Sequence, residues 1–276
     1  MPGGLSTIIF RDLLAADEET RSTWDTELRH TRHAQPAIVL SSLAMLRLLE
    51  FFGLRPTLAI GHSLGEISAL CAAGAYDAST AVRIAALRGR AMADLHLDDP
   101  GSMVAVTADP VTVEKLIASF GSALTISNYN SPKQTVVSGT TAAIEALIQV
   151  CTAQSVRCHR LSVSHAFHSA LVAPAAEAFK NALSRVSLNT LAGTVVSTAS
   201  GQIIPQSVDL RTLLGDHIRQ PVRFAEAVTQ PAQQHPTLWI EVGPGGVLTT
   251  LVRDILGPNN VECLRPIWLG KRDFTC

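Results

Sequence analysis

A serine between two glycines is the first feature of the sequence that indicates chemistry. The stretch AIGHSLGEISAL begins at Ala59 and places Ser63 in a Gly-x-Ser-x-Gly frame. An apolar run (RPTLAI) precedes the frame and an alanine-rich stretch (GEISALCAAGAY) follows it, which predicts a strand, a nucleophile elbow and a helix. Free backbone N–H groups at a helix N-terminus favour negative charge on a reacting oxygen. We therefore predict that Ser63 is a nucleophile and that the Leu64 N–H is an oxyanion donor.

A serine nucleophile needs a base within hydrogen-bond reach. The stretch SVSHAFHSALV holds His165 and His168 between a predicted strand and a predicted helix, where α/β sites gather, and the residues alone do not choose between them. His62 adjoins the serine on the turn, so we expect it to point elsewhere. His217 and His235 lie in polar stretches and are expected at the surface. No Asp between serine and histidine is well placed as a third member, and a backbone carbonyl is the alternative that could orient the imidazole.

An arginine on an apolar helix is the third candidate. Arg88 lies in AVRIAALRGRAM, a stretch otherwise rich in alanine and leucine, and is expected to be partly buried. A buried guanidinium needs an anionic partner, either a structural carboxylate or a substrate carboxylate held by two parallel hydrogen bonds. The sequence leaves both alternatives open.

The composition is that of a globular chain without a strong charge bias. Of 276 residues, 47% are hydrophobic and 16% are charged, and the formal net charge is -1. This balance gives no reason to expect nucleic acid or an anionic membrane as a partner. No apolar stretch is expected to reach transmembrane length, and no leader is predicted, so the expected location is cytoplasmic. The five cysteines include no CxxC pair, which predicts free thiols and no metal site.

The order of predicted elements indicates an α/β protein with an insertion. Residues 102–163 predict β-α-β-β-α-β, the ferredoxin-like pattern, while longer helices and buried strands flank this segment. We predict an α/β-hydrolase-like core with a parallel sheet, built from residues 1–100 and 164–276, and a small ferredoxin-like subdomain at 101–163. Residues 1–34 are polar and expected to be irregular. The histidines come mid-chain, which is not the order of an ordinary α/β-hydrolase.

Six motifs occur in one order along the chain: GHSLGE, ALRGRAM, ISNYNSP, SHAFHS, PVRF and EVGPGGVL. Together they resemble the malonyl-CoA:acyl carrier protein transacylases and the acyltransferase domains of polyketide and fatty acid synthases. The resemblance implies transfer of a malonyl group from malonyl-CoA to the phosphopantetheine thiol of an acyl carrier protein, through an ester on Ser63. It implies coenzyme A thioesters as substrates, no permanently bound cofactor, and neighbouring synthase domains as further partners.

The resemblance also assigns roles by position in the motifs. It implies that His168 is the catalytic histidine and that Arg88 pairs with the malonyl carboxylate. Gln35 and His62 match residues that line the substrate site, and Asn130 lies in a motif near its mouth. The segment Glu241–Gly245 resembles one that holds the histidine through a carbonyl.

Two further features of the resemblance concern selectivity and activity. In this family the motif HAFH accompanies selectivity for malonyl over methylmalonyl donors. Phe167 is expected to crowd the 2-methyl group of methylmalonyl. Discrimination by one methyl group is worth only ~1–3 kcal/mol. The opening MPGGLSTIIF does not match the family's Gly-Gln-Gly loop, which supplies a second oxyanion donor whose loss typically costs ~10²–10³ in kcat. Two alternatives therefore accompany the prediction: a serine hydrolase acting on thioesters, and an impaired domain that only docks a carrier protein.

Overall fold

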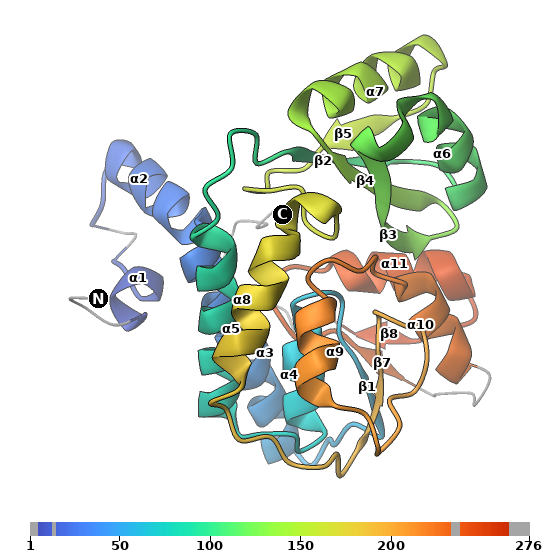
Figure 1. Cartoon of the computed structure of the whole chain (residues 1–276). Helices are drawn as coiled ribbons and strands as arrows, with labels where there is room; N and C mark the ends of the chain where they lie inside the picture. Colours follow the sequence, from blue (N-terminus) through green and yellow to red (C-terminus); the bar gives the residue numbers. More distant parts are fainter. Residues whose placement is uncertain (1–4, 13–14, 233–237, 265–276) are drawn as a thin grey trace.

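The computed structural model describes residues 5–12, 15–232 and 238–264 (Figure 1). Cys71, Cys151, Cys158 and Cys263 are free thiols, as expected. The predictions for Cys276, for His235 and for the last 12 residues of the core lie outside the described residues.

Two short parallel sheets lie in the larger lobe. Strand β1 (Leu58–Ile60) pairs in parallel with β6 (Thr194–Val196), with Ile60 opposite Val196. Strand β7 (Trp239–Ile240) pairs in parallel with β8 (Cys263–Leu264). Since parallel strands need a crossover between them, the chain between β1 and β6 includes helices that pack beside the sheet. Figure 1 shows them around β1.

Most helices of the larger lobe enclose one extended apolar core, while α10 and α11 enclose a second, smaller cluster. The extended core includes Val39 from α3, Leu70 from α4, Ile84 from α5 and Phe179 from α8. Helix α3 lies along α5, and α5 lies along α8. The helices of this lobe are α3 (Thr31–Phe51), α4 (Gly65–Ala72), α5 (Ala78–Ala93), the short 3₁₀ helix η2 (Ala170–Val172), α8 (Ala173–Leu183), α9 (Leu210–Asp216), α10 (Phe224–Ala232) and α11 (Val247–Leu256).

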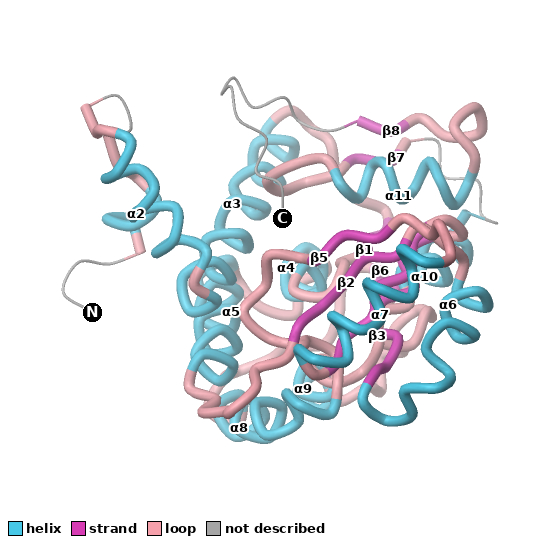
Figure 2. The backbone as a smooth tube through the Cα atoms, turned by 90° about the horizontal axis from the view of Figure 1, so that it is seen from above, coloured by secondary structure: helices cyan, strands magenta, loops and turns pink. Residues whose placement is uncertain are grey.

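The N-terminal segment is helical, so the expectation of an irregular segment is wrong. It forms α1 (Ser6–Ile9) and α2 (Glu18–Arg29), which stand beside the larger lobe in Figures 1 and 2. The Asp17 side chain accepts a hydrogen bond from the Thr20 N–H and caps α2. Glu18 and Glu19 follow in the first turn, where the helix dipole favours acidic side chains.

Helix α3 corrects a second expectation. It has 21 residues, and its most apolar stretch has a mean hydropathy of 1.3, so by length and composition alone it could cross a membrane. Among the described residues it is the one helix that does so, and the expectation that no apolar stretch reaches that length is wrong. Helix α3 packs against α4 and α5 and carries Gln35 into the interior, which is the arrangement of a helix in a folded domain. The absence of a membrane partner stays a prediction.

The smaller lobe has the predicted ferredoxin-like order. Its antiparallel sheet has the strand order β3-β4-β2-β5, with two helices against one face. The predicted α/β class with this inserted unit is confirmed, whereas the domain boundaries stay a prediction. The elements are β2 (Ser102–Val106), α6 (Pro110–Ile117), the 3₁₀ helix η1 (Ala118–Ala123), β3 (Leu124–Ser131), β4 (Gln134–Gly139), α7 (Thr141–Ala153) and β5 (Cys158–Arg160).

Backbone hydrogen bonds join the two lobes beside the predicted site. The Tyr129 N–H donates to the Val222 carbonyl at 2.8 Å, and the Val222 N–H donates to the Ser127 carbonyl at 2.8 Å. Val222 thus extends the edge of β3 by one parallel bridge. In the view of Figure 2, β1 and β6 of the larger lobe overlap β2 and β5 of the smaller lobe in the middle of the molecule, while β7 and β8 lie near its upper edge. The carboxyl ends of β1 and β6 carry Ser63 and Thr198, in the position where α/β proteins place their sites.

Candidate active site

Ser63 lies on a tight turn between β1 and α4. Its φ of +50° is in the left-handed region, which is uncommon for a residue with a side chain and is found at functional sites. A Cβ at Gly61 would overlap the backbone of Gly65 and Glu66, so the first glycine of the frame allows the close approach of strand and helix. The Leu64 N–H, at the start of α4, has no hydrogen-bond partner among the residues that the structure describes.

The structure places His168, and not His165, beside the serine. Ser63 Oγ is 2.7 Å from His168 Nε2, whereas His165 Nδ1 is 2.9 Å from Ser164 Oγ. His168 is 4% exposed and also has a left-handed backbone, with φ of +56°. The sequence could not separate the two histidines, because the distinction depends on which one the loop turns toward Ser63.

A backbone carbonyl orients the imidazole. His168 Nδ1 is 2.8 Å from the Gln220 carbonyl oxygen, which only accepts, so the proton is placed on Nδ1 and Nε2 is left to accept from Ser63. The His168 N–H also donates to the Ile218 carbonyl at 3.2 Å. A carbonyl was expected in this place, but the assignment of Glu241–Gly245 to it is wrong. Glu241 instead accepts hydrogen bonds from the first turn of α11.

Burial keeps the imidazole uncharged. It lowers the pKa of His168 well below its ordinary value, and the nearby His217 and Arg88 lower this pKa further. The hydrogen bond to the Gln220 carbonyl opposes this effect only in part. A neutral imidazole with a free Nε2 lone pair can accept the hydroxyl proton of Ser63.

Arg88 is a buried cation next to the serine. It is 6% exposed, and its guanidinium donates to Gln35 Oε1 at 2.9 Å and to Ser63 Oγ at 3.4 Å. Burial lowers the pKa of Arg88 to about 10, opposed by the charge of Glu66, so the group stays protonated at neutral pH. Among the described residues, no carboxylate oxygen lies within 4.0 Å of it. The alternative of a structural salt bridge at Arg88 is therefore not supported.

Gln35 is held by its own neighbours. Its Nε2 donates to Thr31 Oγ1 at 2.7 Å and approaches Met92 Sδ at 3.0 Å. These contacts fix the amide so that Oε1 faces Arg88. Gln35 therefore fixes one end of the guanidinium and leaves the other end toward Ser63.

His62 and Asn130 join the elbow to the smaller lobe. His62 Nε2 is 2.8 Å from Asn130 Oδ1, and Asn130 Nδ2 donates to Gln134 Oε1 at 2.7 Å. The His62 ring also meets Phe224 edge-on, with the centroids 5.3 Å apart. His62 thus points away from the Ser63 hydroxyl, as expected.

Phe167 precedes the histidine and lies at the junction of the lobes. Its carbonyl accepts a hydrogen bond from Ser138 Oγ at 2.8 Å, and its ring centroid is 5.9 Å from that of His165. Its side chain packs against apolar residues of both lobes. Its role in substrate selection stays a prediction.

Two further candidate residues, Glu66 and His217, could not be singled out from the sequence. Both are buried, with exposed fractions of 0% and 3%, although His217 was expected at the surface. The burial of His217 could have been predicted from spacing, since Leu210 and Leu214 of α9 are buried and His217, the residue that follows this helix, lies seven residues after Leu210. The polar neighbours of His217 hid this periodicity.

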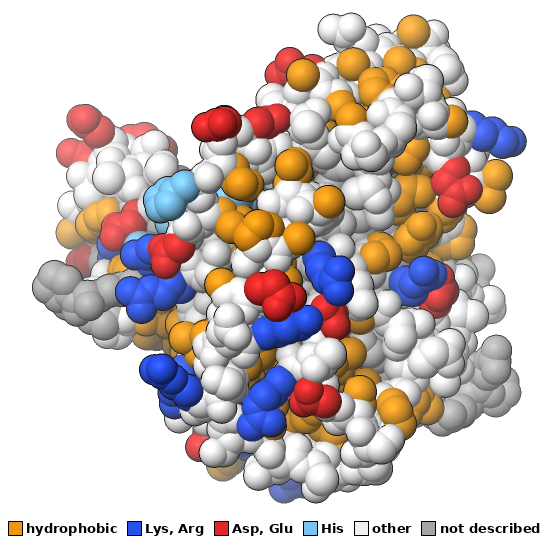
Figure 3. Space-filling model, in the orientation of Figure 1, with side chains coloured by type: hydrophobic (Ala, Val, Ile, Leu, Met, Phe, Trp, Pro, Cys, Tyr) orange, Lys and Arg blue, Asp and Glu red, His pale blue; other side chains and the backbone are white. Residues whose placement is uncertain are grey.

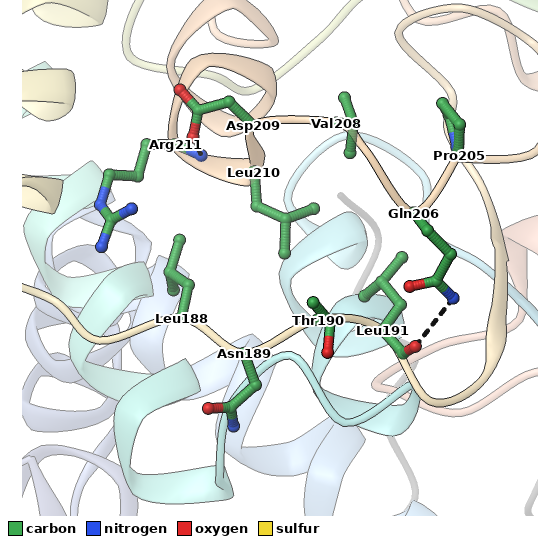
Figure 4. A pocket seen from close by; sticks show the side chains of 10 residues that line it. All are labelled: Leu188, Asn189, Thr190, Leu191, Pro205, Gln206, Val208, Asp209, Leu210 and Arg211. Carbon is green, nitrogen blue, oxygen red and sulfur yellow. Dashed lines mark hydrogen bonds between the residues drawn. The ribbon is translucent and has the colours of Figure 1, made fainter.

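A separate hollow lies between the loop after α8 and the start of α9 (Figure 4). It has a volume of about 170 Å³, and two of the polar side chains on its wall donate hydrogen bonds to backbone carbonyls. Arg211 donates to the Leu183 and Val186 carbonyls, and Gln206 donates to the Leu191 carbonyl at 2.9 Å. None of its lining residues belongs to the Ser63–His168 site, so this hollow is no candidate for the chemistry.

The fold and the site define a class: an α/β domain in which a serine and a histidine lie in hydrogen-bond contact, as in enzymes that form acyl-serine intermediates, with a buried arginine beside the serine. Comparison with known families agrees. The model of the acyl transferase domain matches residues 7–270, and the chain belongs to this family.

Relatives and solved structures support the same assignment. The chain is 38% identical over 232 residues to the polyketide synthase GfsA of Streptomyces halstedii, covering 83% of this chain but 3% of that protein. It is 33% identical to the malonyl CoA-acyl carrier protein transacylase of Bacillus subtilis, covering 83% of this chain and 74% of that one. A solved structure described as PlMCAT:AntF, a type II PKS acyl-carrier protein in complex with its malonyl-transacylase, matches with a TM-score of 0.80, 29% identity, and coverage of 95% and 85%.

Proposed function

We propose that this chain transfers a malonyl group from malonyl-CoA to the phosphopantetheine thiol of an acyl carrier protein, through a malonyl ester on Ser63. The names of the transacylase relatives support the donor and the acceptor. The similarity to a long polyketide synthase supports neighbouring synthase domains as further partners. The coenzyme A thioester acts as a substrate and the phosphopantetheine belongs to the carrier, so the proposal includes no permanently bound cofactor. We propose a cytoplasmic location.

The first half-reaction forms the ester. His168 Nε2 accepts the Ser63 hydroxyl proton while Oγ attacks the thioester carbonyl carbon. The resulting oxyanion is stabilised by the N–H of Leu64. The tetrahedral intermediate collapses, the carbon–sulfur bond breaks, and the imidazolium returns its proton to the coenzyme A thiolate.

The second half-reaction reverses these roles with a different thiol. The carrier thiol gives its proton to His168 and attacks the ester carbonyl, and the C–O bond to Ser63 breaks. The serine oxygen takes the proton back from the imidazolium, and the enzyme is restored. The Gln220 carbonyl holds Nδ1–H throughout, so that Nε2 faces the serine in both half-reactions.

The observation that carries the proposal is the state of Arg88. A buried guanidinium without a carboxylate partner is costly, and a malonyl carboxylate would supply that partner. Its second nitrogen is 3.4 Å from Ser63 Oγ, so a carboxylate bound there belongs to an acyl group attached at that oxygen. An uncharged acyl group such as acetyl would leave the cation unpaired. This argues for a dicarboxylic acyl donor.

Transfer and hydrolysis are separated by the fate of the acyl-enzyme. Malonyl-enzyme freed of malonyl-CoA is mixed with holo acyl carrier protein, with apo carrier protein that lacks the phosphopantetheine, or with buffer, and the masses of both proteins are followed. We expect malonyl to move to the holo carrier much faster than it is lost to water. Equal loss in all three mixtures would identify a thioester hydrolase, and carrier binding without any acyl-enzyme would identify a docking domain.

A further inference from the structure

We propose that Glu66 and His217 are positioning residues for His168. Their buried contacts with each other and with Thr198 anchor residue 217, the start of the segment whose carbonyls hold the imidazole against Ser63. This inference rests on the proposed function of the Ser63–His168 pair and adds two residues that touch neither the serine nor the substrate.

Glu66 joins the start of α4 to the end of β6. Its side chain is 0% exposed. Oε1 accepts a hydrogen bond from Ser197 Oγ at 2.6 Å, and Oε2 accepts one from the Thr198 N–H at 3.0 Å. Burial raises the pKa of Glu66 to about 7, against the effect of these hydrogen bonds and of Arg88. Burial of a carboxyl group costs free energy of desolvation, and the hydrogen bonds from Ser197 and Thr198 offset part of that cost.

His217 completes the network from the other side. Its Nδ1 is 3.3 Å from Glu66 Oε2, and its Nε2 is 3.3 Å from Thr198 Oγ1. Thr198 Oγ1 also lies 2.8 Å from the Gly61 carbonyl oxygen, at the end of β1. Burial lowers the pKa of His217 to about 3, so the ring is neutral and carries one proton. Thr198 Oγ1 links the two side chains, since it lies 3.0 Å from Glu66 Oε2 as well as 3.3 Å from His217 Nε2.

The segment that follows His217 forms the support of the base. The Ile218 carbonyl accepts from the His168 N–H, and the Gln220 carbonyl accepts from its Nδ1. The two imidazole rings are 5.7 Å apart by their centroids, and no hydrogen bond joins them. Glu66 therefore acts on His168 through the backbone of residues 217–220 and not through the ring of His217.

The base needs this support because its backbone conformation is strained. His168 has a φ of +56°, which a residue with a side chain adopts only when its surroundings impose it. Helix α9 ends at Asp216, and the N–H groups of residues 217–220 donate to carbonyls of its last turn, at residues 213–216. These backbone bonds tie the segment to α9, and the side chain of His217 adds contacts that tie it to Glu66 and Thr198, beside the serine turn. Misplacement of a catalytic group by about 1 Å can cost on the order of 10²-fold in rate.

The test compares three variants by the single-turnover rate of acyl-enzyme formation from malonyl-CoA. His217→Phe keeps a ring and removes both nitrogens. His217→Asn keeps an amide nitrogen near the place of Nδ1. Tyr76→Phe is the matched control, because it removes a buried hydrogen bond to the Ile67 carbonyl in the same helix as Glu66 without touching residues 217–220.

We expect His217→Phe to lower the saturating acylation rate by about 10- to 100-fold with little change in the malonyl-CoA concentration that gives half the maximal rate. His217→Asn should recover most of the rate. Tyr76→Phe should lower the unfolding temperature and leave the rate unchanged. If His217→Phe does not fold, Glu66→Gln takes its place in the comparison.

A spectroscopic measurement reads the position of the base directly. The ¹⁵N chemical shifts of the His168 imidazole should report a proton on Nδ1 in the wild type and in Tyr76→Phe, and mixed tautomers in His217→Phe. A folded His217→Phe variant with wild-type acylation and an unchanged His168 signal would overturn the positioning role. A wild-type chain that forms no acyl-enzyme would instead contradict the proposed function, so the two failures are distinct.

Discussion

Ser63 and His168 meet at 2.7 Å, and both adopt a left-handed backbone, with φ of +50° and +56°. Such conformations cost of order 1–3 kcal/mol at each residue that carries a side chain. The surrounding structure therefore holds the two reacting groups in place at some expense of stability. The first prediction follows from this cost.

Substitution of the serine should separate stability from activity. Ser63→Gly should unfold at a higher temperature than Ser63→Ala, by an equivalent of ~1 kcal/mol, because glycine adopts positive φ without a Cβ clash. Both variants should lose acyl-enzyme formation entirely. Thermal unfolding followed by circular dichroism gives the comparison. Equal unfolding temperatures would show that the turn at residue 63 is not strained.

Removal of the arginine should discriminate between donors. Arg88→Ala should lower acylation by malonyl-CoA by ~10- to 100-fold, the equivalent of one lost charge-assisted contact, and leave acetyl-CoA nearly unaffected or improved. Parallel acylation assays with the two donors measure this ratio. Similar losses for both donors would show that the guanidinium does not pair with the acyl carboxylate.

The pH dependence should show a base that stays neutral in mild acid. For a histidine with its ordinary pKa of 6.5, the neutral fraction would fall about fourfold between pH 7.5 and pH 6.0. Because burial lowers the pKa of His168, more of it stays deprotonated at pH 6.0, and the acylation rate should fall by less than about twofold. Single-turnover rates across this range test it. A fourfold fall would indicate an ordinary, solvated imidazole.

Selectivity for the acyl group should depend on the residue before the base. Phe167→Ser should raise the rate with methylmalonyl-CoA relative to malonyl-CoA by about 10-fold, within the range that one methyl group supplies. A mixture of the two donors with detection by mass gives the ratio in one experiment. An unchanged ratio would place the selectivity elsewhere.

The sequence predicted the elements that carry periodic or motif signals. The turn at Ser63 and the inserted ferredoxin-like sheet are of this kind, because glycine frames and strand alternation are local properties. The sequence could not predict which backbone groups hold the base, because a residue of any type could supply the carbonyl by which Gln220 binds His168. His217 was missed because its burial depends on the packing of α9.

The distribution of charge on the surface explains why composition alone did not indicate a binding partner. On the face shown in Figure 3, acidic, basic and apolar side chains are interspersed without one dominant sign. A formal net charge of -1 agrees with that distribution.

The covalent intermediate is the most direct test of the whole account. The intact mass of the protein is measured after incubation with malonyl-CoA, and the modified peptide is then sequenced by fragmentation. We expect one added malonyl group, located on Ser63, and no addition to Ser63→Ala. A malonyl group on another residue, or labelling that survives in Ser63→Ala, would contradict this expectation.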